Sequence, residues 1–154
     1  IIIDIWERIG KITNWDLVII GDGCIRQKLE QTVRDKQIQR VSFTGQVNHP
    51  EEYYKSAKII LLTSSFEGFP MCLIEALRFG VIPLTFDISA GVRSIVSNSG
   101  GIIIKNRNSN EMFLKLQELI NNKYLHSLSE KARLKSNRYT LNRIGEQWIN
   151  LLRK

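Results

Sequence analysis

Residues 64–80 read SSFEGFPMCLIEALRFG and follow directly on an apolar run, KIILLT. Gly68 and Pro70 predict a sharp turn, and the residues after this turn have the spacing of a helix that ends at a glycine. Two carboxylates, Glu67 and Glu75, stand on either side of the turn. The stretch therefore predicts a buried strand, a loop and a helix, with an acidic side chain before the helix and another within it.

Short apolar runs and amphipathic stretches alternate along the rest of the chain. The apolar runs predict strands at 15–21, 41–45, 58–64, 81–86 and 100–105. The amphipathic stretches predict helices at 1–14, 25–37, 49–57, 71–80, 108–122, 128–140 and 141–154, with Ser109 as a cap. Strands that lack polar alternation and are separated by helices indicate a parallel sheet covered on both faces. We expect one α/β domain over residues 1–154.

The composition is that of an ordinary globular chain with an excess of basic residues. The 154 residues are 43% apolar and carry a net charge of +7. No apolar run approaches the roughly 20 residues of a spanning helix, and the opening has no basic leader. Cys24 and Cys72 lack metal-ligand spacing, which favours a reduced, cytoplasmic setting. The excess of basic residues is consistent with solvated helix faces, with binding of an anionic ligand or with attraction to an anionic membrane surface. Nucleic acid is not expected as a partner, because no aromatic residues are interleaved with the basic ones.

Two glycine-bearing loops follow predicted strands. One is Gly21-Asp22-Gly23, and the other is the loop at 64–70. In open parallel sheets, ligands bind beyond the carboxyl ends of the strands, where a helix N-terminus offers free N–H groups to a phosphate. The first loop fits a ligand site and a plain tight turn equally well. The second loop carries more chemistry because it combines a turn with two carboxylates.

Glu75 has apolar neighbours in the sequence, including Leu73 and Ala76. A carboxylate in apolar surroundings needs partners that replace water. The two hydroxyls of a ribose could satisfy it, as an acidic side chain does in dinucleotide-binding folds. An ion pair with Arg78 or with an adjacent basic group could satisfy it equally well, and the spacing alone leaves both possibilities open.

The sequence EGFPMCLIEA at 67–76, followed by Gly80, resembles the E-x7-E signature of retaining, GT-B-fold glycosyltransferases of family four (glycosyl transferases group 1). VIIGDG at 18–23 and VSFTGQV at 41–47 are similar to family segments in the same order, so the resemblance covers nearly the whole chain. It implies the C-terminal, donor-binding half of a GT-B fold. This half is a Rossmann-like parallel sheet with helices on both faces, here with its first strand missing and the N-terminal acceptor domain absent.

The resemblance also implies roles for individual residues. Glu67 would be catalytic, bonding hydroxyls of the donor sugar and stabilising positive charge at its anomeric carbon, and Glu75 would hold the ribose. The remaining implied donor-binding positions lie in the surrounding loops: Gly21, Asp22, Gly23, Gln46, Val47, Gly68, Phe69, Pro70, Met71, Cys72 and Leu73. No metal and no cofactor are implied besides the nucleotide-diphosphate sugar substrate, because helix N-termini and basic side chains can offset the diphosphate charge.

The implied enzyme is a retaining, hexosyltransferase-type glycosyltransferase of cell-surface polysaccharide or lipopolysaccharide synthesis. It would work in the cytoplasm, with peripheral association at the inner face of an anionic membrane, on a saccharide or lipid-linked acceptor held by the absent domain. The isolated chain is therefore expected to be inactive. Arg93 and Ser94 depart from the family's usual proline-glutamate pair. The alternatives are a non-catalytic nucleotide-binding module, or a GT-B enzyme of other chemistry such as a sugar-nucleotide epimerase or a phosphorylase.

Overall fold

The computed structural model describes residues 1–153. Its strands are β1 (Leu17–Ile20), β2 (Val41–Gly45), β3 (Ile59–Leu62), β4 (Ile82–Phe86) and β5 (Ile102–Ile104). Its α-helices are α1 (Ile2–Ile9), α2 (Arg26–Asp35), α3 (Glu51–Ser56), α4 (Met71–Arg78), α5 (Ala90–Val96), α6 (Ser109–Ile120), α7 (Leu125–Ser136) and α8 (Leu141–Leu152). Two short 3-10 helices, η1 (Lys105–Arg107) and η2 (Asn137–Tyr139), connect them.

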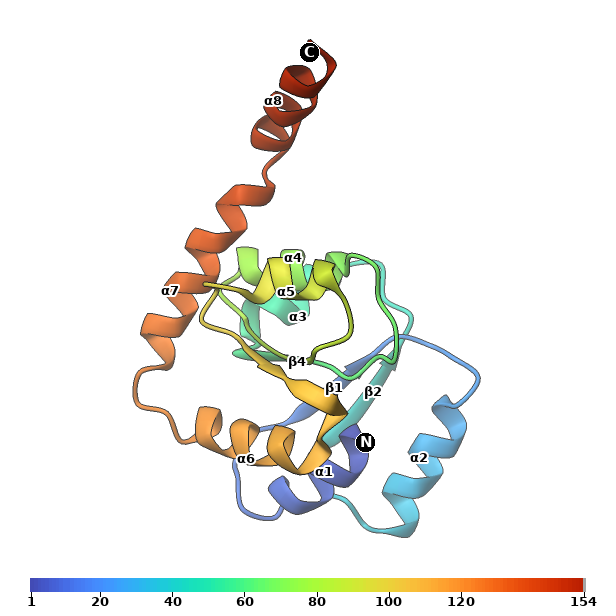
Figure 1. The fold of residues 1–154 in the computed structure, drawn as a ribbon. Coiled ribbons are helices and arrows are strands. Elements are labelled where there is room, and N and C mark those ends of the chain that lie inside the picture. Colours follow the sequence, from blue (N-terminus) through green and yellow to red (C-terminus); the bar gives the residue numbers. More distant parts are fainter. Residues whose placement is uncertain (154) are drawn as a thin grey trace.

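All the strands of the sheets pair in parallel, as the sequence predicts, and they form two sheets. One sheet has the order β1-β2 and the other the order β3-β4-β5. Helices α3, α4 and α5 lie over one face, while α1 and α6 lie under the other (Figure 1). This is the α/β class with helices on both faces, and it arises because each parallel strand needs a crossover helix to reach the next one.

The core is centred on β4, in which every residue is buried. Leu84 and Phe86 on β4 and Ile104 on β5 have no exposed surface. Such complete burial on both faces explains why this strand reads as a continuous apolar run. At the other sheet, α2 buries none of its residues, so the half formed by β1, β2 and α2 is packed more thinly.

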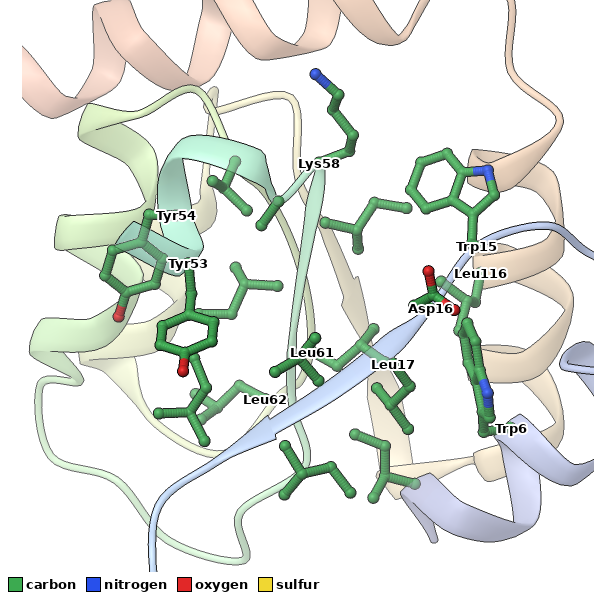
Figure 2. A pocket seen from close by; sticks show the side chains of 18 of the residues that line it. Trp6, Trp15, Asp16, Leu17, Tyr53, Tyr54, Lys58, Leu61, Leu62 and Leu116 are labelled. Atoms are coloured by element: carbon green, nitrogen blue, oxygen red, sulfur yellow. The ribbon is translucent and has the colours of Figure 1, made fainter. Parts of the chain in front are cut away.

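A largely apolar cavity of about 870 Å³ separates β1 from β3. Figure 2 shows Leu17 of β1 on one side of it, and Leu61 and Leu62 of β3 on the other. Within residues 1–153, neither β1 nor β3 pairs with a strand along the edge that faces this cavity.

The C-terminal part extends away from the body, with α8 at its far end (Figure 1). No residue of α8 is buried, and Leu141, Trp148 and Leu152 expose most of their surface.

On α7, burial lowers the pKa of the Lys135 ammonium, and the nearby Arg138 lowers it further. Within residues 1–153, no helix is both long and apolar enough to cross a membrane.

The structure differs from the sequence-based elements at several places. Helix α5 was not predicted from the sequence. The side chain of Asn108, rather than that of Ser109, caps α6 by accepting hydrogen bonds from two backbone N–H groups. The predicted helix at 1–14 ends at Ile9, and α7 begins at Leu125 rather than at 128. The expected helix at 141–154 includes Lys154, which lies outside the described residues.

Candidate donor site

The site is built around the N-terminus of α4. Strand β3 ends at Leu62, and the loop that follows runs to Pro70, which immediately precedes the helix. Pro70 lies in extended backbone and contributes no side-chain cap. The first N–H groups of a helix have no intrahelical partner, so an uncapped start leaves them available to an anionic ligand.

The two carboxylates of the signature both affect one thiol, that of Cys72. Burial raises the pKa of the Cys72 thiol, and the negative charges of Glu67 and then Glu75 raise it further. Both carboxylates thus act on the same group at the start of α4. Glu67 lies in the loop before α4 and Glu75 lies within the helix, as the sequence predicted.

Glu75 is not buried, contrary to the expectation from its apolar neighbours. It lies on the exposed face of α4, while Leu73, Ala76 and Leu77 point into the core. The Tyr54 hydroxyl of α3 donates a hydrogen bond to Oε2 of Glu75 at 3.3 Å. Burial raises the pKa of Tyr54, and the charge of Glu75 contributes to the shift, so this hydroxyl keeps its proton. No ion pair joins Glu75 to Arg78 in the described part of the chain.

The loop before α4 is held at its centre by α5 and η2. The Ser89 hydroxyl, which caps α5, donates to the carbonyl of Gly68 at 3.3 Å. A Cβ at Gly91 would collide with that same carbonyl, so α5 can approach the loop this closely only with glycine there. The Phe69 ring meets the Tyr139 ring edge-on, with centroids 6.0 Å apart. None of these supports was predicted, because their partners are distant in the sequence.

The other predicted positions of the β3–α4 loop differ in exposure. Gly68, Phe69 and Met71 are exposed, whereas Pro70 is buried. Leu73 is buried in the core with no exposed surface, and its N–H bonds the carbonyl of Pro70 at 3.2 Å. Any effect of Leu73 on a ligand would therefore pass through the packing of α4.

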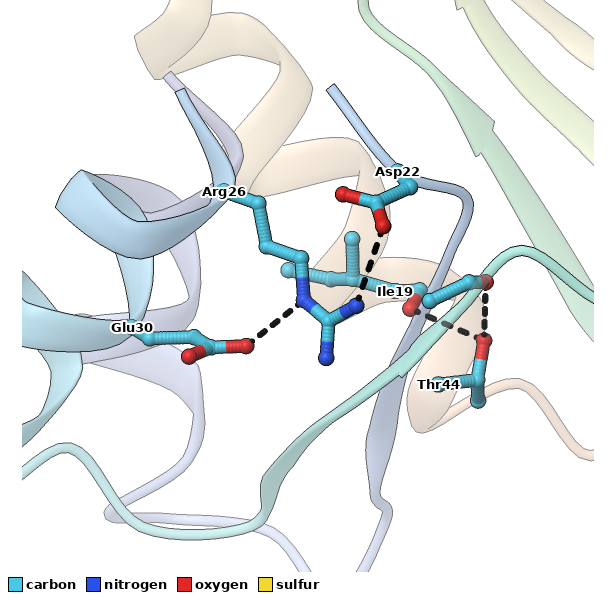
Figure 3. A network of polar contacts seen from close by, with 6 residues as sticks. Ile19, Asp22, Arg26, Glu30 and Thr44 are labelled. Atoms are coloured by element: carbon cyan, nitrogen blue, oxygen red, sulfur yellow. Dashed lines mark hydrogen bonds and ion pairs between the residues drawn. The ribbon is translucent and has the colours of Figure 1, made fainter. Parts of the chain in front are cut away.

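The glycine loop after β1 has a different environment. The N–H of Gly21 bonds the carbonyl of Gly45 at 2.8 Å, which places Gln46 and Val47 next to this loop. In Figure 3, the Arg26 guanidinium lies between two carboxylates, with Nε 2.7 Å from Glu30 and a terminal nitrogen 3.5 Å from Asp22. These contacts raise the pKa of Arg26, with the Glu30 hydrogen bond as the largest cause. The positive charge of Arg26 is therefore already paired with these two carboxylates.

Two cavities open near these loops. Asp22 and Gly23 line a cavity of about 490 Å³ together with residues of α2. The larger cavity between the sheets is lined at one end by Ile20, Tyr54, Ser64 and Cys72. The end of β1 and the start of α4 therefore border one space. Among residues 1–153, no three His, Cys, Asp or Glu side chains gather to hold a metal ion.

The model of the family described as glycosyl transferases group 1 matches residues 1–137. The chain belongs to this family. An uncharacterised glycosyltransferase of Haemophilus influenzae is 33% identical over 98% of this chain and 44% of its own length. The amylovoran biosynthesis glycosyltransferase AmsD of Erwinia amylovora is 29% identical over 98% of the chain and 43% of its own length.

Solved structures agree with the family assignment. A Staphylococcus aureus TarM variant, in complex with fondaparinux, alpha-GlcNAc-glycerol and UDP, is 30% identical and superposes with a TM-score of 0.86. The match covers 99% of this chain and 32% of that one. The structural neighbours are GT-B glycosyltransferases, which establishes the fold. The chain spans less than half the length of the curated relatives described above.

Proposed function

We propose that this chain is the donor-binding domain of a retaining, hexosyltransferase-type glycosyltransferase that uses a nucleotide-diphosphate sugar. The observation that carries the proposal is the uncapped start of α4, with Glu67 in the loop before it and Glu75 on the exposed face of the helix. Two acidic groups beside free helical N–H groups match a donor that presents hydroxyls and phosphates together. The hydroxyls donate to the carboxylates, while the phosphates accept from the N–H groups.

The two carboxylates have separate roles in this proposal. Glu75, oriented by Tyr54, accepts hydrogen bonds from the ribose hydroxyls of the nucleotide. Glu67, on the loop, faces the donor sugar and stabilises positive charge as the bond to the leaving diphosphate breaks. The remaining proposed donor contacts are Gly21, Asp22, Gly23, Gln46, Val47, Gly68, Phe69, Pro70, Met71, Cys72 and Leu73.

The relatives support the class of substrate and product. TarM has been solved with UDP, and AmsD is named for the biosynthesis of amylovoran. We extend this to a nucleotide-sugar donor and to cell-surface polysaccharide or lipopolysaccharide synthesis at the cytoplasmic side of a membrane. The acceptor would be a saccharide or a lipid-linked saccharide held by a second domain. The isolated chain should therefore bind nucleotide weakly, with a Kd of about 0.1 mM or higher, and transfer no sugar.

Thermal melting with UDP, GDP and ADP, with and without EDTA, tests the donor proposal. A nucleotide at 100 times its Kd should add about 2.7 kcal/mol of stability. One nucleotide should stabilise the chain more than the other two, and EDTA should leave the shift unchanged if no metal is needed. No shift with any nucleotide up to 100 times the expected Kd would contradict the proposal. Transfer by the isolated chain would contradict the need for a second domain.

Membrane association is a separate part of the proposal and follows from the net charge of +7. Co-sedimentation with vesicles that contain anionic lipid tests it against neutral vesicles. Binding should be confined to the anionic vesicles and should weaken as salt is added. Equal binding to both kinds of vesicle, or to neither, would remove this part of the proposal without affecting the donor site.

A further inference from the structure

Arg107 joins the ends of three strands that are far apart in the sequence. It is the last residue of η1, directly after β5, and its guanidinium contacts the backbone where β3 ends. One terminal nitrogen donates to the carbonyl of Ser64 at 2.6 Å, and the other donates to the carbonyl of Thr63 at 3.3 Å. The guanidinium carbon lies 5.1 Å from the ring centroid of Phe86, at the end of β4. One side chain thus connects β3, β4 and β5 at the edge where the candidate site lies.

The backbone at this point adopts a conformation that arginine rarely takes. Asn106 has a φ of 53° and Arg107 a φ of 50°, both in the left-handed region. Asparagine tolerates this region, but a long side chain such as that of arginine adopts it only with strain. A strained residue of this kind persists where its surroundings hold it, and such residues cluster at functional sites. Here the strain aims the guanidinium at the two carbonyls.

The segment that Arg107 holds is the start of the loop that carries Glu67. Residues 63–70 form no helix or strand, so the loop has no regular hydrogen-bonded scaffold of its own. Arg107 fixes the carbonyls at 63 and 64, and the Ser89 hydroxyl contacts the carbonyl at 68. Glu67 lies between these two anchored points. No ion pair joins Arg107 to a carboxylate in the described part of the chain, so its contact with the loop is with backbone carbonyls.

We propose that Arg107 is a positioning residue for sugar transfer, which clamps the β3–α4 loop so that Glu67 faces the donor sugar. The inference rests on the proposed role of Glu67, but the clamp itself can be measured without any substrate. Arginine suits this task because its planar fork presents two donors at a fixed separation, whereas lysine presents a single point charge. The clamp therefore depends on the shape of the side chain as well as on its charge.

The chain provides a matched control in Arg40. Its φ is 59°, so it has the same left-handed strain, but its side chain forms only an exposed pair with Asp16 at 3.6 Å. Glycine relieves such strain wherever it occurs. Arg107→Gly and Arg40→Gly should therefore relieve the backbone strain equally. Only Arg107→Gly should release the β3–α4 loop. Arg107→Lys keeps the charge and removes the fork.

Backbone ¹⁵N relaxation of the 154-residue chain tests the clamp directly. Order parameters of residues 65–68 should fall from about 0.85 in the wild type to below about 0.6 in Arg107→Gly, and they should also fall in Arg107→Lys. Arg40→Gly should leave the loop rigid. A rigid loop in Arg107→Gly would overturn the proposal. If the loop becomes mobile in Arg107→Gly but stays rigid in Arg107→Lys, the positive charge and not the planar fork holds the loop. This result would also overturn the proposal.

Kinetics in a polypeptide that carries both halves test the link to function. Arg107→Gly should lower kcat by about 100-fold, since a misplacement of about 1 Å can cost this much, with little change in KM for the donor. A mobile loop with unchanged kcat would overturn the positioning role. If the wild type neither binds nucleotide nor transfers sugar, the proposed function fails, whereas the relaxation result on the clamp still stands by itself.

Discussion

The loops after β1 and after β3 look alike in the sequence but are built differently. Each contains glycine, two residues in the first loop and one in the second, and each follows a strand at the same edge of the molecule. The β3–α4 loop is supported by α5, by η1 and by η2. In the β1–α2 loop, a Cβ at Gly21 or Gly23 would meet nothing within 4 Å. A Cβ at Gly68 of the β3–α4 loop would likewise meet nothing, so the loop glycines themselves do not differ. The difference lies in Gly91 of α5, which packs against the carbonyl of Gly68, whereas the β1–α2 loop has no such helix against its glycines.

The largest expected effect concerns the carboxylate next to the supported loop. Glu75→Gln should weaken nucleotide binding about 10- to 150-fold, because a hydrogen bond to a charged group contributes about 1.5–3 kcal/mol. Glu30→Gln, beside the β1–α2 loop, removes a carboxylate that already pairs with Arg26, and should leave affinity unchanged. Isothermal titration with the stabilising nucleotide measures both. Equal losses in the two variants would remove the distinction between the loops.

The glycines give the next largest effect. Gly91→Ala should destabilise the chain by about 1–3 kcal/mol, because its Cβ collides with the Gly68 backbone and overpacking has this cost. Gly23→Ala should change stability by no more than about 0.5 kcal/mol, since its Cβ enters open space. Urea unfolding of both variants provides the comparison. A tolerated alanine at 91 would mean that α5 does not hold the loop.

Each loop also precedes a cysteine, so thiol labelling can compare them in one sample. Cys24 is exposed and should react readily, whereas burial and the two carboxylates raise the pKa of Cys72 and reduce its thiolate at neutral pH. We expect Cys72 to react with iodoacetamide about tenfold more slowly than Cys24 at neutral pH. The difference between the two rates should become smaller as the pH rises. Glu67→Gln removes a neighbouring negative charge and should speed the labelling of Cys72 only. Equal rates at neutral pH would place Cys72 outside the carboxylate pair.

The smallest expected effect concerns the hydroxyl that orients Glu75. Tyr54→Phe removes one hydrogen bond and should reduce nucleotide affinity by about 0.5–1.5 kcal/mol, with the ring still packed against Phe79. Tyr53→Phe, on the same helix, serves as the control and should have no effect. A loss of affinity as large as that of Glu75→Gln would give Tyr54 a direct contact with the nucleotide instead.

The sequence predicted those features that depend on neighbouring residues. The apolar runs located every strand, and the Gly-Phe-Pro turn located the start of α4 at Met71. The sequence also placed Glu67 in the loop before α4 and Glu75 within the helix. Helix α5 was missed because it has only seven residues and includes a glycine that long-range packing requires.

The support of the site could not be predicted in the same way. Tyr54 reaches Glu75 across 21 residues, and Arg107 reaches Ser64 across 43. Such contacts depend on how the crossover helices and the sheet place distant segments, and no local spacing encodes them. The exposure of Glu75 was misjudged for a related reason. Its sequence neighbours are apolar, but α4 turns them towards the core and leaves the carboxylate at the surface.

The separate roles of Glu67 and Glu75 are tested most directly by comparing nucleotide binding with sugar transfer in one variant. In a polypeptide that carries both halves, Glu67→Ala should bind the free nucleotide as the wild type does, because Glu75 still holds the ribose. Its rate of transfer should fall by about 100-fold or more, since the stabilisation of the transition state is lost. If Glu67→Ala instead loses nucleotide affinity and transfer in equal proportion, the loop does not face the sugar, and the account of the site is wrong.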